Sequence, residues 1–200
     1  MNTKSDQILG KFANTLFTMK YDKPDWDNES FIESFRPKQV QCKWWLTREI
    51  SYTQAHFDKV LVLGSWNGCL LYEYLTSQCD VKHFDFVDVD KNVHKDRDYY
   101  FSTNKMKKNY RSIVEDATSI SHEGYDLVIN TSCEHMPDIQ SIYGPLYALQ
   151  SNNYVDIPEH SNCVKSAKEL AGKWDINETA HKDKLNMGSY TRFLVIGCHY

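Results

Sequence analysis

The sequence predicts an α/β protein with a doubly wound, mostly parallel sheet of seven strands and a C-terminal antiparallel hairpin. Short apolar runs alternate with segments of helical spacing, which is typical of parallel strands covered by helices on both faces. The run Val60–Leu63 leads into a turn, 64–68, that contains two glycines, as a buried first strand does before a helix. Polar residues follow four of the apolar runs, at the points where the strands end.

Residues 1–50 are expected to form an N-terminal helical extension, a candidate substrate lid, ahead of a Rossmann-like core over 58–200. Apolar residues recur near helical spacing within 38–50, so this segment is predicted to be an amphipathic helix. Its mixed face could serve as core or as a ligand wall. No linker-like tract divides the 200 residues, which we therefore expect to form one domain.

The core elements follow from the apolar runs and the polar residues that bound them. Asp90 is the predicted N-cap of a charged helix, because its carboxylate can accept a hydrogen bond from the first turn. The predicted strands are 60–63, 81–90, 111–114, 125–130, 145–150, 177–185 and 190–198, and the predicted helices between them are 70–76, 91–101 and 162–173.

The composition bounds the location and the partners. A net charge of −4 gives no general basic surface for nucleic acid or anionic membranes. The six cysteines form no CxxC pair and are predicted to be reduced thiols. No signal-peptide pattern and no apolar stretch of about 18 residues is present, so we expect a cytoplasmic protein without a membrane partner. The oligomeric state stays open.

The polar residues at the strand ends predict one ligand cleft. They are the turn 64–68 after the first strand, Asp88 and Asp90 at the second, Asp116 at the third, and 130–135 after the fourth. In an open parallel sheet, ligands bind outside the carboxyl ends of the strands. The turn lacks both GxGxxG and the GK[ST] of a phosphate-binding loop, which favours a nucleoside without a pyrophosphate.

On these residues the chain resembles the class I S-adenosylmethionine-dependent methyltransferases over about 60–138. The segment 39–46 is also similar to small phage-encoded members. The resemblance implies S-adenosylmethionine as the cofactor, with the ribose hydroxyls on Asp88, and Asn130 to Ser132 facing the sulfonium. It further implies that the methionine part of the cofactor lies along Gly64, Ser65, Trp66, Asn67 and Gly68, and that Val89, Asp116 and Ala117 meet the adenine.

The chain departs from the usual motifs of that family in two places. Ser65, Trp66 and Asn67 stand between the glycines, where the family has a GxGxG pattern or close to it. The Asn/Asp-Pro-Pro-Tyr/Phe signature of amino-methyltransferases is absent after the fourth strand, and so is a Pro-Cys pair of the cytosine-C5 type. The acceptor, a small molecule or a macromolecule, is therefore not predicted.

Two residues after the fourth strand are candidate catalytic groups. Methyl transfer is an in-line displacement at carbon, so alignment and a desolvated cleft can supply much of the rate. His135 is the candidate general base for an acceptor that must lose a proton, and Glu134 would orient it or bind a cationic acceptor.

Three alternatives remain open from the sequence. The same cofactor can donate an aminocarboxypropyl group or, once decarboxylated, an aminopropyl group, and the fold can also belong to a non-catalytic nucleoside-binding interaction protein. Cys133 and His135 could meet His160 and Cys163 around a metal such as zinc, but no zinc-ribbon pattern is present, and we predict no metal site.

Overall fold

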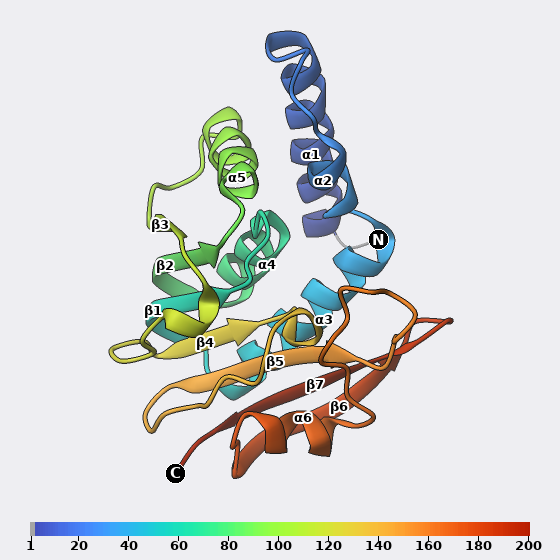
Figure 1. Cartoon of the computed structure of the whole chain (residues 1–200). Helices are drawn as coiled ribbons and strands as arrows, with labels where there is room; N and C mark the ends of the chain where they lie inside the picture. The colour runs from blue at the N-terminus through green and yellow to red at the C-terminus, as the bar shows by residue number, and fades with distance from the viewer. Residues whose placement is uncertain (1–2) are drawn as a thin grey trace.

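The computed structural model describes residues 3–200, which form a seven-stranded sheet in the order β3-β2-β1-β4-β5-β7-β6 (Figure 1). Strands β3, β2, β1, β4 and β5 run parallel, whereas β7 is antiparallel to both β5 and β6. This confirms the predicted fold class. The strands are β1 His56–Leu63, β2 Asp80–Asp88, β3 Tyr110–Val114, β4 Leu127–Asn130, β5 Leu146–Asn152, β6 Glu178–Asn186 and β7 Thr191–Cys198.

The order of the parallel strands reverses between β1 and β4. From β1 the chain moves outward to β2 and β3, then returns to the other side of β1 for β4 and β5. The register pairs Leu63 with both Val87 and Asn130, so the carboxyl ends of β1, β2 and β4 lie level. Such a reversal leaves a crevice above the strand ends, where ligands of α/β sheets bind.

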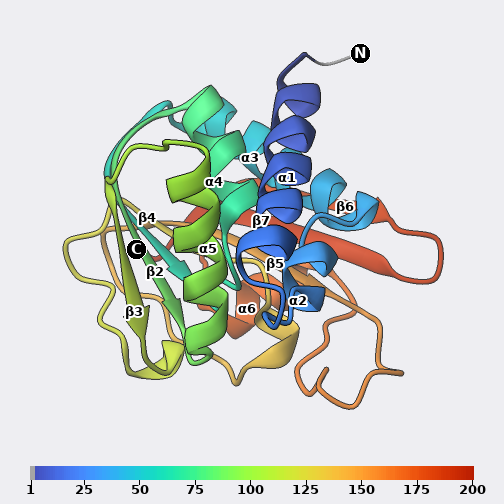
Figure 2. The same cartoon turned by 90° about the horizontal axis from the view of Figure 1, so that it is seen from above.

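The helices are distributed unequally over the two faces of the sheet. Figures 1 and 2 show α1, α2, α4 and α5 gathered on one side, with α6 on the other. The helices are α1 Thr3–Asp22, α2 Glu29–Glu33, α3 Pro37–Thr53, α4 Cys69–Gln78, α5 Lys91–Thr103 and α6 Ala167–Lys173, with short 3₁₀ turns η1 Ala117–Ser119 and η2 Cys133–His135. The second face is therefore covered largely by connecting loops.

Each face of the sheet has its own apolar core. On the helix-rich face, Trp45 and Leu46 of α3 pack in one buried cluster with Val60 and Val62 of β1. On the other face, alternate residues of the same strand pack in a cluster with Trp174. A strand buried on both faces reads as a continuous apolar run, which is why β1 was recognisable in the sequence.

Some boundaries differ from the predicted ones. Strand β1 begins at His56, earlier than predicted. Its first residues alternate, with Phe57 buried between exposed neighbours, so the start of the strand lacks the continuous apolar run that marks the rest. Strand β2 ends at Asp88 rather than at Asp90, whose Oδ1 accepts the Asn92 N–H at 2.8 Å as the predicted N-cap of α5. Helix α6 begins at Ala167 rather than at residue 162, and the side chain of Ser166 accepts the Glu169 N–H as its N-cap. Residues 153–166 before it form an irregular loop.

The helices were also searched for a membrane span. Within residues 3–200, no helix combines the length and the apolar character that crossing a bilayer requires.

Candidate functional site

The turn 64–68 between β1 and α4 forms the floor of the site, and its glycines are required by geometry. Gly64 has φ 55° and Gly68 has φ 66°, both in the left-handed region. A Cβ on Gly68 would lie 2.7 Å from the ring of Phe86, so the backbone is also in close contact with the strand below. The Ser65 N–H donates to the Val87 carbonyl at 2.9 Å, which ties the turn to β2.

Trp66 adopts a left-handed conformation although it carries a bulky side chain. Its φ is 49°, which an L-residue adopts only at an energetic cost. Two hydrogen bonds hold it: its N–H donates to Asp88 Oδ2 at 2.8 Å, and its indole Nε1 donates to Ser30 Oγ at 2.7 Å. The first bond links the turn directly to the carboxylate at the end of β2.

A buried cation supports the turn from below. Arg97 of α5 is 0% exposed, and its Nη1 lies 3.5 Å from the Trp66 carbonyl and 3.4 Å from the Asn67 carbonyl. The same nitrogen lies 3.3 Å from Ser65 Oγ, and the guanidinium lies 4.4 Å from the centre of the Phe86 ring. These carbonyl oxygens therefore point into the protein and are satisfied there.

The larger of two cavities above the strand ends has a volume of about 600 Å³. Asp88, whose Oδ1 accepts the Asp90 N–H at 3.1 Å, lies at its edge. Two hydrogen bonds from Thr118 lower the pKa of Asp116, so this carboxylate is ionised at neutral pH. The wall consists of Ser30, Gly64, Trp66, Asp88, Val89, Asp90, Val93, Glu115, Asp116, Ala117, Ser132, His135, Met136 and Pro137.

The smaller cavity lies next to the larger one, and Trp66, Ser132 and His135 line both. The Lys43 ammonium of α3 donates to Thr131 Oγ1 at 2.8 Å. Burial and the charge of Arg192 lower the pKa of Lys43 to about 8, which leaves it mostly protonated at pH 7. The remaining lining residues are Ser34, Gln39, Ser65, Asn67, Gly68, Cys69, Leu70, Leu71 and Glu134.

Glu134 forms a buried ion pair, but not with the partner that the sequence suggested. Its Oε1 accepts hydrogen bonds from Arg192 Nη2 at 3.0 Å and from Asn152 Nδ2 at 2.6 Å. Partial burial lowers the pKa of His135, although the nearby Glu134 charge opposes this shift. Among the described residues, no hydrogen bond joins Glu134 to His135, because Oε1 of the carboxylate is engaged by β7 and β5. The roles of Glu134 as a group that orients His135 or binds a cationic acceptor stay predictions.

The structure brings together almost all of the predicted site residues. Gly64, Trp66, Asp88, Val89, Asp116, Ala117, Ser132 and His135 line the larger cavity, and Ser65, Asn67, Gly68 and Glu134 line the smaller one. Asn130 differs from them, since it is 0% exposed and lines neither cavity. Its Oδ1 accepts the Ser132 N–H at 2.8 Å, so Asn130 shapes the loop after β4 rather than facing a ligand.

Several residues of the site were not found from the sequence. Arg192 had a recognisable signal, because it is the one charged residue in the apolar run 190–198. Lys43 lies in the predicted helix 38–50, whose mixed face fits either the core or a ligand wall. Arg97 and Ser30 gave no signal, because nothing local distinguishes them from solvent-exposed residues.

The fold was compared with known proteins. No protein-family model and no curated protein sequence matches the chain. Among solved structures, TehB from Haemophilus influenzae superposes with a TM-score of 0.57 at 13% identity, over 77% of this chain and 61% of TehB. Coclaurine N-methyltransferase bound to N-methylheliamine and S-adenosylhomocysteine gives 0.56 at 16% identity, over 74% of this chain and 51% of that one.

A third structure is TrmK from M. capricolum in complex with S-adenosylhomocysteine, its natural cofactor product. It gives a TM-score of 0.53 at 9% identity, over 76% of this chain and 66% of TrmK. The chain thus spans between half and two thirds of these three proteins. The strand order, the terminal hairpin and these superpositions together show that the chain has the class I S-adenosylmethionine-dependent methyltransferase fold.

Proposed function

We propose that the protein is an S-adenosylmethionine-dependent methyltransferase that holds the nucleoside part of its cofactor in the larger cavity. The observation that supports this most strongly is the placement of Asp88. Its carboxylate stands at the carboxyl end of β2, is bonded to the turn through the Trp66 N–H, and borders a cavity that has room for a nucleoside. A carboxylate in this place can accept hydrogen bonds from both ribose hydroxyls.

The surrounding side chains fit the rest of such a ligand. Val89 is 68% exposed at the cavity and, with Ala117, offers apolar surface to an adenine ring, while Asp116 can accept a hydrogen bond from an exocyclic amine. The turn 64–68 leads from this cavity to the smaller one, where the Lys43 ammonium can pair with a carboxylate. The donor set thus matches an amino acid joined to a nucleoside.

When bound, the cofactor would supply an electrophilic methyl group on its sulfonium. The protein would contribute alignment of the acceptor and exclusion of water, which can account for much of the rate of an in-line displacement. His135 lines both cavities together with Trp66 and Ser132, and its imidazole is the group among these three that can take a proton from an acceptor near neutral pH.

Isothermal titration calorimetry with S-adenosylmethionine and S-adenosylhomocysteine tests the cofactor assignment. We expect micromolar binding of both, and a loss of roughly 10- to 100-fold in affinity for Asp88→Ala, since a hydrogen bond to a charged group contributes about 1.5–3 kcal/mol. Asp80→Ala is the matched control, because Asp80 begins the same strand at the opposite edge of the sheet. Unchanged affinity in folded Asp88→Ala would refute the ribose assignment.

Product analysis separates methyl transfer from the two alternatives. Incubation with S-adenosylmethionine and candidate acceptors should yield S-adenosylhomocysteine. Methylthioadenosine would instead indicate transfer of the aminocarboxypropyl group. The aminopropyl alternative requires decarboxylated S-adenosylmethionine as the donor, and it too would yield methylthioadenosine. Binding without either product across acceptor classes would favour an interaction protein.

A further inference from the structure

Three side chains beside the smaller cavity form a cluster, of which the methyl-transfer proposal uses only His135. Glu134 and His135 belong to η2, and His160 belongs to the loop 153–166. One potential ligand atom from each lies within 4.8 Å of the other two. Within residues 3–200, this is the one group of three or more His, Cys, Asp or Glu side chains that is close enough to share a metal ion.

Glu134 contributes an unsatisfied buried oxygen to this cluster. The residue is 1% exposed, and Oε1 takes both of its hydrogen bonds, from Asn152 and Arg192. Oε2 has no hydrogen-bond partner, although it is buried. Burying a carboxylate oxygen without a partner is costly, and a bound cation would remove that cost.

One of the two histidines, His160, is held in the way that metal ligands are held. His160 Nδ1 lies 2.6 Å from the Tyr154 carbonyl, so Nδ1 carries the proton and Nε2 has a free lone pair. Outer-shell carbonyls that fix the tautomer and the orientation of the ring are characteristic of metal-binding histidines.

The cysteines considered from the sequence do not join the cluster. Cys133 is buried, with its Sγ 3.7 Å from the Asn130 carbonyl, and the Cys163 Sγ lies 3.4 Å from the Tyr154 carbonyl. The donors are thus two imidazoles and one carboxylate. Arg192 pairs with the Glu134 carboxylate and neutralises part of its negative charge. This donor set therefore suits a first-row transition metal better than Mg²⁺ or Ca²⁺, which require several hard oxygen ligands.

We propose that Glu134, His135 and His160 bind a first-row divalent metal ion such as Zn²⁺, with an open coordination position toward the cleft. Three protein ligands and one open position are typical of catalytic metal sites. His135 is exposed and lines both cavities, so the open position faces the space beside the turn.

The proposed metal site indicates the chemical class of the methyl acceptor. This inference about the acceptor rests on the proposed function. A metal ion at this position would bind a hydroxyl oxygen and lower the pKa of that hydroxyl. The proton passes to solvent water, the oxygen electron pair forms the new C–O bond, and the C–S bond breaks with its electron pair remaining on sulfur. The favoured acceptors are therefore alcohols or phenols rather than amines.

Metal binding can be measured on the full chain without cofactor. After treatment with a chelator and its removal, titration with Co²⁺ or Zn²⁺ should give one tight site per chain. The Co²⁺ absorption spectrum should lack a sulfur-to-metal charge-transfer band, because no thiolate is a ligand. His160→Ala and Glu134→Gln should each weaken binding at least about tenfold, whereas the matched controls His199→Ala and Cys163→Ser should not.

The outcomes distinguish this inference from the cofactor proposal. The affinity for S-adenosylhomocysteine, measured on metal-free protein, should be unchanged in His160→Ala, and this measurement also shows that the variant is folded. Failure to bind Co²⁺ and Zn²⁺ stoichiometrically at micromolar concentrations, a thiolate band, or equal metal affinity in His160→Ala would each overturn the metal site. None of these results would affect the assignment of Asp88.

Discussion

The two cavities of the cleft are built in different ways, although they share a wall. The larger one is formed mainly by residues at or just beyond the carboxyl ends of β1, β2 and β3, such as Gly64, Asp88 and Asp116. The smaller one draws its charged groups from segments far apart in the chain, with Lys43 on α3 and Arg192 on β7. The first depends on the fold itself, which supports the proposal that the cofactor binds there. The second depends on individual charges, and these are expected to determine what is specific to this protein.

The largest expected effect on the free energy of unfolding comes from removing the buried ion pair beside the smaller cavity. Arg192→Met should destabilise the metal-free protein by about 3–5 kcal/mol, because it leaves the buried Glu134 carboxylate without its cation. Urea unfolding followed by circular dichroism measures the loss. The double variant Arg192→Met with Glu134→Gln should recover most of it, since no unpaired charge remains. A loss below about 1 kcal/mol in the single variant would contradict the importance of this pair.

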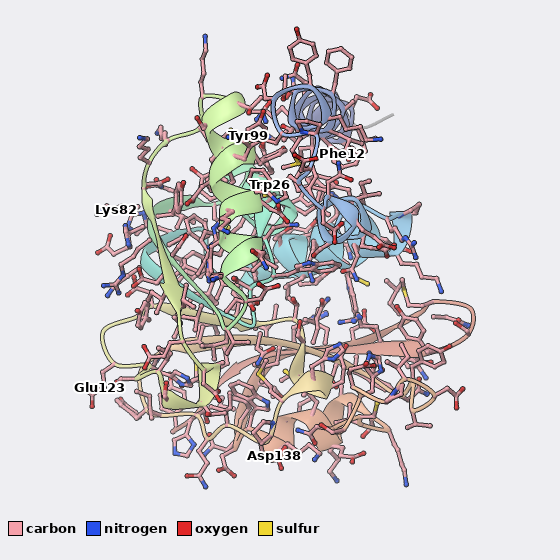
Figure 3. All side chains as sticks on the ribbon, turned by 45° about the horizontal axis from the view of Figure 1, so that its top comes forward. Phe12, Trp26, Lys82, Tyr99, Glu123 and Asp138 are labelled. Carbon is pink, nitrogen blue, oxygen red and sulfur yellow. The ribbon has the colours of Figure 1, made fainter. Side chains whose placement is uncertain are left out.

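A second prediction concerns a neighbouring cavity, which shares Ser30, Asp90 and Val93 with the larger one. Trp26 and Tyr99 meet edge to face where the N-terminal segment packs on α5 (Figure 3), and Asp96 is buried nearby at 2% exposed. Burial, with the charges of Asp90 and Asp27, raises the pKa of Asp96 to about 7, while Lys95 and the hydrogen bond from Trp26 oppose this.

The sign of the pH dependence follows from that shift. A carboxyl whose folded pKa lies above its unfolded value stabilises the fold while it is protonated, and this contribution is lost as the pH rises from about 4 through 7. Asp96→Asn should therefore match the wild type at pH 4 and exceed it at pH 8, by up to about 4 kcal/mol. Urea unfolding across this range checks it, and parallel pH profiles for the two proteins would refute it.

The smallest effect tests the wall that the two cavities share. Trp66 has φ 49°, which glycine adopts freely and alanine does not. Trp66→Gly should therefore be more stable than Trp66→Ala by about 0.5–1 kcal/mol, the reverse of the usual order. Thermal unfolding of the two variants measures the difference, and both lose the same indole contact with Ser30. Greater stability of the alanine variant would contradict the left-handed backbone.

The same contrast explains what could be predicted from the sequence. The fold and the placement of Asp88 and Asp116 followed from local patterns, because apolar runs mark the strands and the residues at their ends must share one edge. The pairing of Glu134 with Arg192 joins residues 58 positions apart, and the approach of His160 depends on an irregular loop. No local periodicity encodes such contacts, since the packing of the whole sheet sets them.

The buried guanidinium of Arg97 has a consequence for the thermodynamics of ligand binding. Together with Asp88 and Ser30, it fixes the turn 64–68 through bonds that are internal to the protein. Ordering one backbone residue costs about 1–2 kcal/mol of conformational entropy, and here that cost is met during folding rather than at binding. The turn is thus preorganised, and a ligand that enters the cleft loses little free energy to restricting it.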